Sequence, residues 1–128
     1  MTAVGSYLPA NVVTNEALSS FVDTDDAWIR RRTGIAQRHL VAEGETTADL
    51  ACNAATKALA NAGLTGGDID IIIIATTTPD NTFPSTATKL QYMIDAKDAI
   101  AFDIQAVCAG FVYALDIADA MLQSGRGR

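Results

Sequence analysis

The sequence predicts a layered α/β protein, and three observations lead to that prediction. Residues 46–62 place apolar side chains at the spacing of one helix face. Two short apolar runs, 69–74 and 99–104, have the composition of buried strands, and a helical pattern follows each of them. Alanine makes up 23 of the 128 residues, and such small side chains let helices and a sheet approach one another closely.

The composition excludes several classes of protein. Nine basic and fifteen acidic residues give a net charge of −6, which argues against a nucleic-acid-binding face. The longest apolar runs have five residues, such as 71–75, whereas a membrane span needs ~20. No secretory leader opens the chain, so a cytoplasmic protein is expected. Two cysteines 56 positions apart and a single histidine do not form a zinc site, and no metal is expected.

Short elements are predicted for the first third of the chain. Residues 2–5 have the pattern of a strand end, and a turn is expected at 9–11. Thr14 is the predicted N-cap of a short helix that ends at Val22. Thr24 is the predicted N-cap of a second helix that ends near Arg32, and Gly34 follows as its stop signal.

Longer elements are predicted for the rest. Thr46 and Asp49 have the spacing of a capping box for a helix that ends at Gly63. Pro84 is expected to begin a helix that ends at residue 93 or 94. Residues 107–123 form a helical pattern that is apolar on nearly every side, which predicts a buried helix. Only five residues follow it, so we expect the covering elements to lie outside this chain.

Cys108 is the candidate nucleophile. It lies where the second predicted strand passes into the last helix, and a helix N-terminus offers free N–H groups and the positive end of the dipole, which favour a thiolate. Ala109 and Gly110 are expected to leave room for a substrate beside the sulfur. The alternative is a buried structural cysteine, because cysteine is often buried. Cys52 lies within the amphipathic helix and is predicted to be structural.

Two further groups of side chains carry candidate roles. His39 follows Arg38 in a loop-like stretch, and a solvated position is expected for it; no base for Cys108 is evident. The basic cluster 30–32 has two interpretations. It is either a solvated helix end that complements the dipole, or a phosphate clamp beside the flat stacking surface of Trp28.

Seven short motifs occur in a fixed order: Gly5–Pro9, Thr24–Ile29, Arg32–Ile35, Arg38–His39, Ala75–Thr78, Phe83–Ser85 and Ala106–Phe111. In these motifs the chain resembles the N-terminal part of β-ketoacyl-acyl carrier protein synthase III, the initiating condensing enzyme of bacterial type II fatty-acid synthesis. The resemblance extends along essentially the whole chain. It implies the thiolase-like fold of two similar α/β halves, with residues 1–128 as an incomplete first half and the second half absent.

The resemblance also implies a ping-pong reaction and roles for particular residues. Acyl-CoA acylates Cys108, malonyl-acyl carrier protein is decarboxylated, and its carbanion attacks the thioester. Trp28 resembles the residue that stacks on the CoA adenine, with Thr24 and Arg32 on the same nucleotide. Phe83 resembles the side chain that crosses a homodimer to close the acyl pocket, which favours a short primer such as acetyl-CoA. Coenzyme A thioester is then a substrate, and no cofactor is expected.

The chain also departs from the family's pattern. The histidine and asparagine that promote decarboxylation, the glycine-rich oxyanion segment and an arginine facing the tryptophan belong to the family's second half, and nothing here matches them. His39 does not match the catalytic histidine. We therefore expect the 128-residue chain alone to be inactive. Two alternatives remain open: a non-catalytic remnant or interaction fragment of such an enzyme, and a related condensing enzyme of secondary metabolism.

Overall fold

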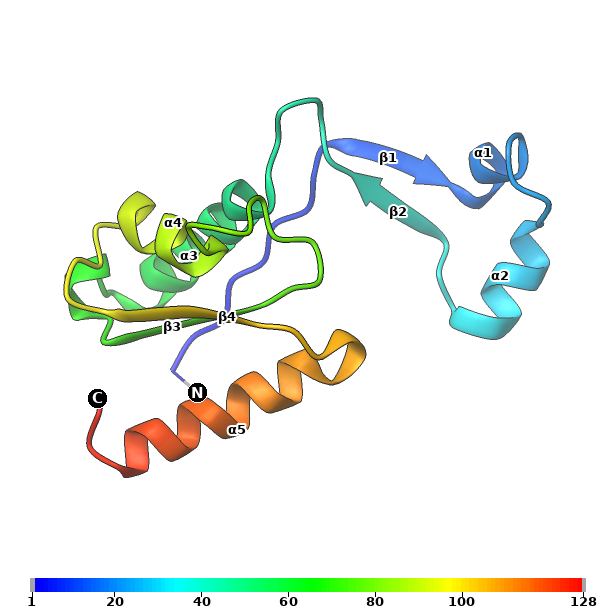
Figure 1. The fold of residues 1–128 in the computed structure, drawn as a ribbon. Coiled ribbons are helices and arrows are strands. Elements are labelled where there is room, and N and C mark those ends of the chain that lie inside the picture. The colour runs from blue at the N-terminus through cyan, green and yellow to red at the C-terminus, as the bar shows by residue number, and fades with distance from the viewer. Residues whose placement is uncertain (1, 128) are drawn as a thin grey trace. The chain divides into compact units, whose positions relative to one another are not determined.

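The computed structural model describes residues 2–127, which form two compact units. The small unit is Leu8–Glu45, and within the described residues the large unit joins residues 2–7 to residues 46–127. The helices and strands of both units, drawn in Figure 1, confirm the predicted α/β class.

The small unit consists of a two-stranded sheet and two helices (Figure 1). Its elements are β1 (Asn11–Thr14), α1 (Asn15–Ser19), α2 (Asp26–Thr33) and β2 (Gln37–Leu40). β1 and β2 are antiparallel, with Val12 opposite His39. This sheet was not predicted from the sequence, where a turn and a loop were expected, because four-residue strands of mixed polarity show no alternation of apolar and polar side chains.

Side-chain caps fix the ends of these two helices. The Thr14 hydroxyl accepts a hydrogen bond from the N–H of Ala17 at 3.1 Å, as predicted, although α1 ends at Ser19 and not at Val22. The N-cap of α2 is Asp25, whose carboxylate accepts from the N–H of Trp28 at 2.6 Å. The prediction of Thr24 was wrong by one residue, because aspartate is a stronger N-cap than threonine. Gly34 ends α2 with a φ of 74°, as predicted.

The large unit is built around two parallel strands. Its elements are α3 (Thr47–Ala62), the 3₁₀ turn η1 (Gly66–Asp68), β3 (Ile71–Ala75), α4 (Thr86–Met93), β4 (Ile100–Ile104), the 3₁₀ turn η2 (Val107–Ala109) and α5 (Gly110–Gln123). β3 and β4 pair in parallel. Helices α3 and α4 lie on one face of this pair and α5 on the other, so the unit has three layers (Figure 1).

The capping box predicted for α3 is confirmed. The Thr46 hydroxyl accepts from the N–H of Asp49 at 3.2 Å, and the Asp49 carboxylate accepts from the N–H of Thr46 at 2.8 Å. Hydrogen bonds from the Thr46 side chain and backbone hold the pKa of Asp49 below its ordinary value. Gly63 closes the helix with a φ of 68°.

The structure differs from the sequence predictions at residues 2–5 and at the start of α4. Residues 2–5 form no strand; the carbonyls of Val4 and Ser6 instead accept hydrogen bonds from Asn61 and Lys57 of α3, at 2.9 and 3.0 Å. Helix α4 begins after Ser85, whose hydroxyl caps the N–H of Thr88, and not at Pro84.

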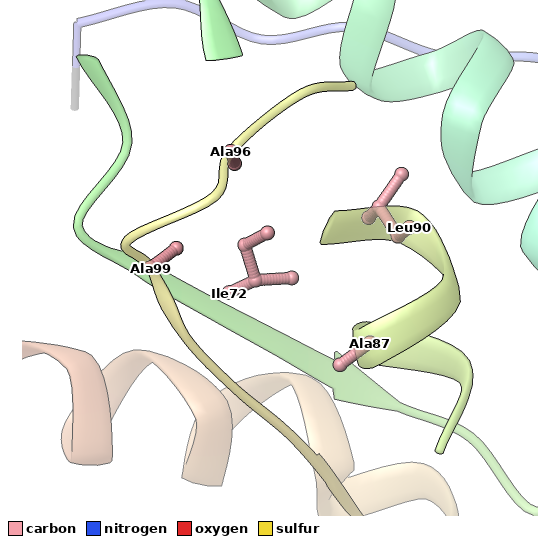
Figure 2. Close-up of a cluster of buried hydrophobic side chains, with 5 residues drawn as sticks. All are labelled: Ile72, Ala87, Leu90, Ala96 and Ala99. Carbon is pink, nitrogen blue, oxygen red and sulfur yellow. The ribbon is translucent and has the colours of Figure 1, made fainter. Parts of the chain in front are cut away.

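The core of the large unit is small and rich in alanine. Ile72 of β3 faces Ala87 and Leu90 of α4, and Ala96 and Ala99 complete the cluster (Figure 2). α5 is less covered than its pattern predicted: Phe111 is 65% exposed, and its neighbours Val112 and Tyr113 are also exposed. The reason is that, within residues 2–127, α5 packs on β3 through one side only. No helix in the described part of the chain has the length and hydropathy to cross a membrane.

Candidate functional site: a cysteine at a helix start and a tryptophan pocket

Cys108 lies between the end of β4 and the start of α5. It is the middle residue of η2, its thiol is free, and the residue is exposed. α5 begins two residues later, so the positive end of the helix dipole lies next to the sulfur. The structure therefore places Cys108 at the strand-to-helix position that the sequence predicted, with its thiol exposed among the described residues; its role as the nucleophile stays a prediction.

The backbone around Cys108 makes a sharp turn. Val107 has a φ of 47°, in the left-handed region that β-branched residues seldom adopt, and such strain is often found at functional sites. Gly110 is buried, and a Cβ there would lie 3.1 Å from the Cβ of Ala75. The glycine thus lets the start of α5 pack on β3, whereas the sequence suggested that it leaves space for a substrate.

An apolar groove of about 700 Å³ opens beside the sulfur. Cys108 and Val107 line it together with Phe111 of α5 and Ala75 of β3. The groove continues between β3 and α5 as far as Leu122, near the end of that helix. Ligand sites are usually concave and apolar with a few polar groups, and this groove has that character.

The strand before Cys108 is tied to the start of α4. Both oxygens of the Asp103 carboxylate accept backbone hydrogen bonds, from the N–H of Thr86 at 2.8 Å and from that of Ala87 at 2.7 Å. This carboxylate satisfies two of the free donors of the helix. It also holds β4 against the segment that contains Phe83. Asp103 was not predicted from the sequence, because a carboxylate that caps a helix from a distant strand leaves no local spacing pattern.

Phe83 makes almost no contact with its own chain. Its side chain is 89% exposed, just before the start of α4. Its assignment to an acyl pocket stays a prediction.

The second candidate site is a pocket in the small unit. It has a volume of about 510 Å³ and is lined by Trp28, Thr24 and Ile29 with Leu18 and Val22. The Trp28 ring is 46% exposed. The Thr24 hydroxyl is buried, and no hydrogen-bond partner for it exists among the described residues. A buried hydroxyl without a partner is costly, so a shift of this segment that exposes it to a partner would be favourable.

The three arginines of α2 have different surroundings. The guanidinium of Arg32 lies over the Trp28 ring, 5.0 Å from its centroid, in a cation–π contact. Arg30 donates through Nε to both oxygens of Asp26 at 2.8 Å. Hydrogen bonds from Asn15 and then Arg30 hold the pKa of Asp26 below its ordinary value. All three arginines are exposed in the last turn of α2, so both interpretations of the cluster stay open.

His39 and Cys52 have structural surroundings. The Nδ1 of His39 donates to the Pro9 carbonyl at 2.6 Å, which requires a proton on that nitrogen. The ring is half-buried on β2, so the prediction of a solvated loop residue was wrong. Cys52 is half-buried in α3 and packs against the Ile72 cluster, as its structural assignment predicted. Among the described residues, no three side chains of a metal-binding type are gathered at one place.

Comparison with known proteins identifies the family of the chain. The profile of 3-oxoacyl-[acyl-carrier-protein] synthase III matches residues 102–128, which include Cys108. Beta-ketoacyl-[acyl-carrier-protein] synthase III of Paramagnetospirillum magneticum is 59% identical over 95% of this chain. The chain belongs to the 3-oxoacyl-[acyl-carrier-protein] synthase III family. It corresponds to an N-terminal portion, and it spans 38% of the length of that relative.

Solved structures establish the fold of this synthase III portion. The crystal structure of 3-oxoacyl-[acyl-carrier-protein] synthase III from Aquifex aeolicus has a TM-score of 0.91 and 49% identity, over 98% of this chain and 40% of its own. The priming β-ketosynthase of the R1128 polyketide pathway has a TM-score of 0.92 and 34% identity, over 99% of this chain and 38% of its own. The predicted thiolase-like fold is thereby confirmed.

Proposed function

We propose that this chain carries the acyl-accepting cysteine and part of the coenzyme A entrance of a cytoplasmic 3-oxoacyl-[acyl-carrier-protein] synthase III. The observation that carries the proposal is the exposed Cys108, at a strained turn before α5 and beside an apolar groove. Family membership supports it, because the relatives that the chain matches bear this activity in their names.

The proposed reaction has two half-reactions. The Cys108 thiolate attacks the carbonyl carbon of a short acyl-CoA; the new C–S bond forms, and coenzyme A leaves as its thiol after taking a proton. Malonyl-acyl carrier protein then loses carbon dioxide, and the resulting carbanion attacks the acyl-cysteine carbonyl. A C–C bond forms and the cysteine thiolate is regenerated. The apolar side chains beside the sulfur suit an acyl group.

The Trp28 pocket supports recognition of the nucleotide of coenzyme A. Arg32 covers one face of the Trp28 ring, which leaves the opposite face for the adenine. Thr24 lines the same pocket, and the exposed Arg32 guanidinium is available to attract the phosphates of the nucleotide. This arrangement favours the phosphate-clamp interpretation of the arginine cluster.

Phe83 supports a homodimer with short primers. A ring with almost no contact in its own chain is suited to filling a partner's acyl pocket. Such a ring occupies the volume that a longer acyl chain would need. Acetyl-CoA is therefore the proposed primer.

A related condensing enzyme is the second candidate. The high TM-score to a priming β-ketosynthase of polyketide synthesis favours it. The two functions differ in the carrier protein that accepts the product. Parallel assays with a fatty-acid and a polyketide acyl carrier protein separate them.

The cysteine assignment is tested in the native full-length protein. Cys108→Ala is expected to lower condensation of acetyl-CoA with malonyl-acyl carrier protein by about 10³-fold or more, because the nucleophile is lost. Cys52→Ala is the matched control and retains activity. Peptide mass spectrometry after brief iodoacetamide treatment is expected to show Cys108 labelled faster than Cys52, with protection by acetyl-CoA. Activity in Cys108→Ala equal to that of the control contradicts the proposal, and inactivity of the unmodified protein supports the non-catalytic alternative.

A further inference from the structure

The most deeply buried polar side chain of the small unit is Asn15, the first residue of α1. It is 1% exposed, yet every polar atom of its amide has a partner. Nδ2 donates to Oδ1 of Asp26 at 2.8 Å and to the carbonyl of Ile35 at 2.8 Å. Oδ1 accepts from Nη2 of Arg38 at 2.7 Å. Buried amides with complete hydrogen bonding fix one arrangement of their neighbours, since a shift leaves a polar group unpaired.

The partners of Asn15 are arranged about a single helix. Asp26 is the first residue of α2, and Ile35 follows the Gly34 that ends it. One amide therefore holds α2 at both of its ends. Through Arg38, which also donates to the Val13 carbonyl at 3.2 Å, the same amide ties α2 to both strands of the β1–β2 sheet.

Apolar packing contributes little to holding α2 in place. Ile29 is the one large apolar side chain of residues 8–45 in the buried class. A hydrophobic contact through a single side chain does not set the rotation of a helix, because the hydrophobic effect has no direction. The orientation of Trp28 and Arg32, which lie on the same helix, thus depends on hydrogen bonds at its ends.

We propose that Asn15 is a positioning residue of the Trp28 pocket, acting through Asp26 and Ile35 to set the orientation of α2. The inference rests on the proposed function, because it takes the pocket to hold the nucleotide of coenzyme A. Asn15 itself lines no part of that pocket. Its effect is on recognition of the nucleotide and not on the chemistry at Cys108.

The test compares two substrates in the native full-length protein: acetyl-CoA, and acetyl-pantetheine, which lacks the nucleotide. Asn15→Asp retains the shape of the side chain and the Arg38 partner. It replaces the donating NH₂ with an oxygen that faces the Asp26 carboxylate and the Ile35 carbonyl. We expect the KM for acetyl-CoA to rise about tenfold, the size of one lost charge-assisted hydrogen bond. The KM for acetyl-pantetheine and both kcat values are expected to change less than about twofold.

A second variant and a control complete the test. Asp26→Asn is a milder change at a half-buried position, and we expect it to raise the KM for acetyl-CoA alone by about threefold. If Asn15→Asp does not fold, the KM values of Asp26→Asn test the proposal instead. Glu16→Gln, an exposed neighbour on α1, is expected to change neither KM. An equal change for both substrates, or none in either variant, overturns the inference.

The outcomes also separate the inference from the proposed function. If the unmodified protein has the same KM for both substrates, the nucleotide pocket is wrong, and the inference falls with it. If Trp28→Ala raises the KM for acetyl-CoA whereas Asn15→Asp and Asp26→Asn do not, the pocket stands and the inference alone is overturned.

Discussion

The two units hold their candidate site residues in different ways. In the large unit, a cluster of small apolar side chains packs α4 on the sheet, and Cys108 follows a strand of that sheet. In the small unit, the buried side chains include Ile29 and Asn15, and every polar atom of the Asn15 amide is hydrogen-bonded. Trp28 lies on α2, the helix that these hydrogen bonds hold.

The difference follows from size. A unit of ~40 residues buries too little apolar surface to fix its elements by packing alone. Directional hydrogen bonds at Asn15 take over that role, because each is satisfied in one geometry only. We conclude that the position of Trp28 is sensitive to polar changes, and that the sheet leading to Cys108 is sensitive to changes of volume.

Leu90→Ala probes the apolar side of this comparison and has the largest expected effect. Leu90 is 5% exposed and faces Ile72, so its truncation leaves a cavity beside the sheet. We expect a loss of about 2–5 kcal/mol in the free energy of unfolding of the large unit, measured by denaturant titration. Tyr92→Ala on the same helix is the control: Tyr92 is 88% exposed, and a change within about 0.5 kcal/mol is expected. Equal losses in both variants would show that this cluster is not the core.

Two adjacent glycines provide a sharper probe of close packing. A Cβ at Gly66 would lie 1.7 Å from the carbonyl oxygen of Ile94, whereas one at Gly67 meets nothing closer than 3.7 Å. Backbone cannot move aside as a side chain can, so Gly66→Ala is expected to cost about 1–3 kcal/mol. Gly67→Ala is expected to stay within about 0.5 kcal/mol. Thermal unfolding of the two variants measures the difference, and similar midpoints would refute it.

The large unit was the more predictable of the two from sequence. Its α3 capping box and the two strands β3 and β4 follow from local patterns: Thr46 with Asp49, and two short apolar runs. The strands of the β1–β2 sheet were missed because they have four residues each and show no alternation of apolar and polar side chains. The pairing itself joins residues far apart in sequence in both sheets, such as Val12 with His39 and Ile71 with Ile100, and propensity along the chain does not encode it.

The candidate sites show the same limit. Cys108 was identified because its strand-to-helix position is visible in the sequence. The positive φ of Val107 was not predicted, because β-branched residues such as valine are rarely found in the left-handed region. Asn15 and Asp103 have roles that depend on hydrogen-bond partners brought by folding from α2, β2 and α4. The resemblance to the family supplied Trp28, Thr24 and Arg32, for which composition left two interpretations open.

Low pH is expected to weaken the hydrogen bonds of Asp26 in the small unit. The pKa of Asp26 lies below its ordinary value of 3.8, so ionised Asp26 stabilises the folded small unit. That contribution is complete above pH ~3.8 and is lost as the pH falls through the lower folded pKa. Below it, a protonated Asp26 binds Asn15 and Arg30 more weakly, and we expect the surroundings of Trp28 to change. The effect is smaller than those above, because Asp26 is partly exposed and solvent screens its charge.

The measurement isolates Trp28, the one tryptophan of this chain, by subtracting the fluorescence of a Trp28→Phe variant. Titration from about pH 6 to pH 2 is expected to show a transition below pH ~3.8. The transition is absent in Asp26→Asn, which cannot gain the proton. It persists in Asp49→Asn, although the pKa of Asp49 is also lowered, because that capping box belongs to the large unit. A transition that survives Asp26→Asn would show that other carboxylates control the orientation of α2, and that the network at Asn15 is not where the small unit responds to acid.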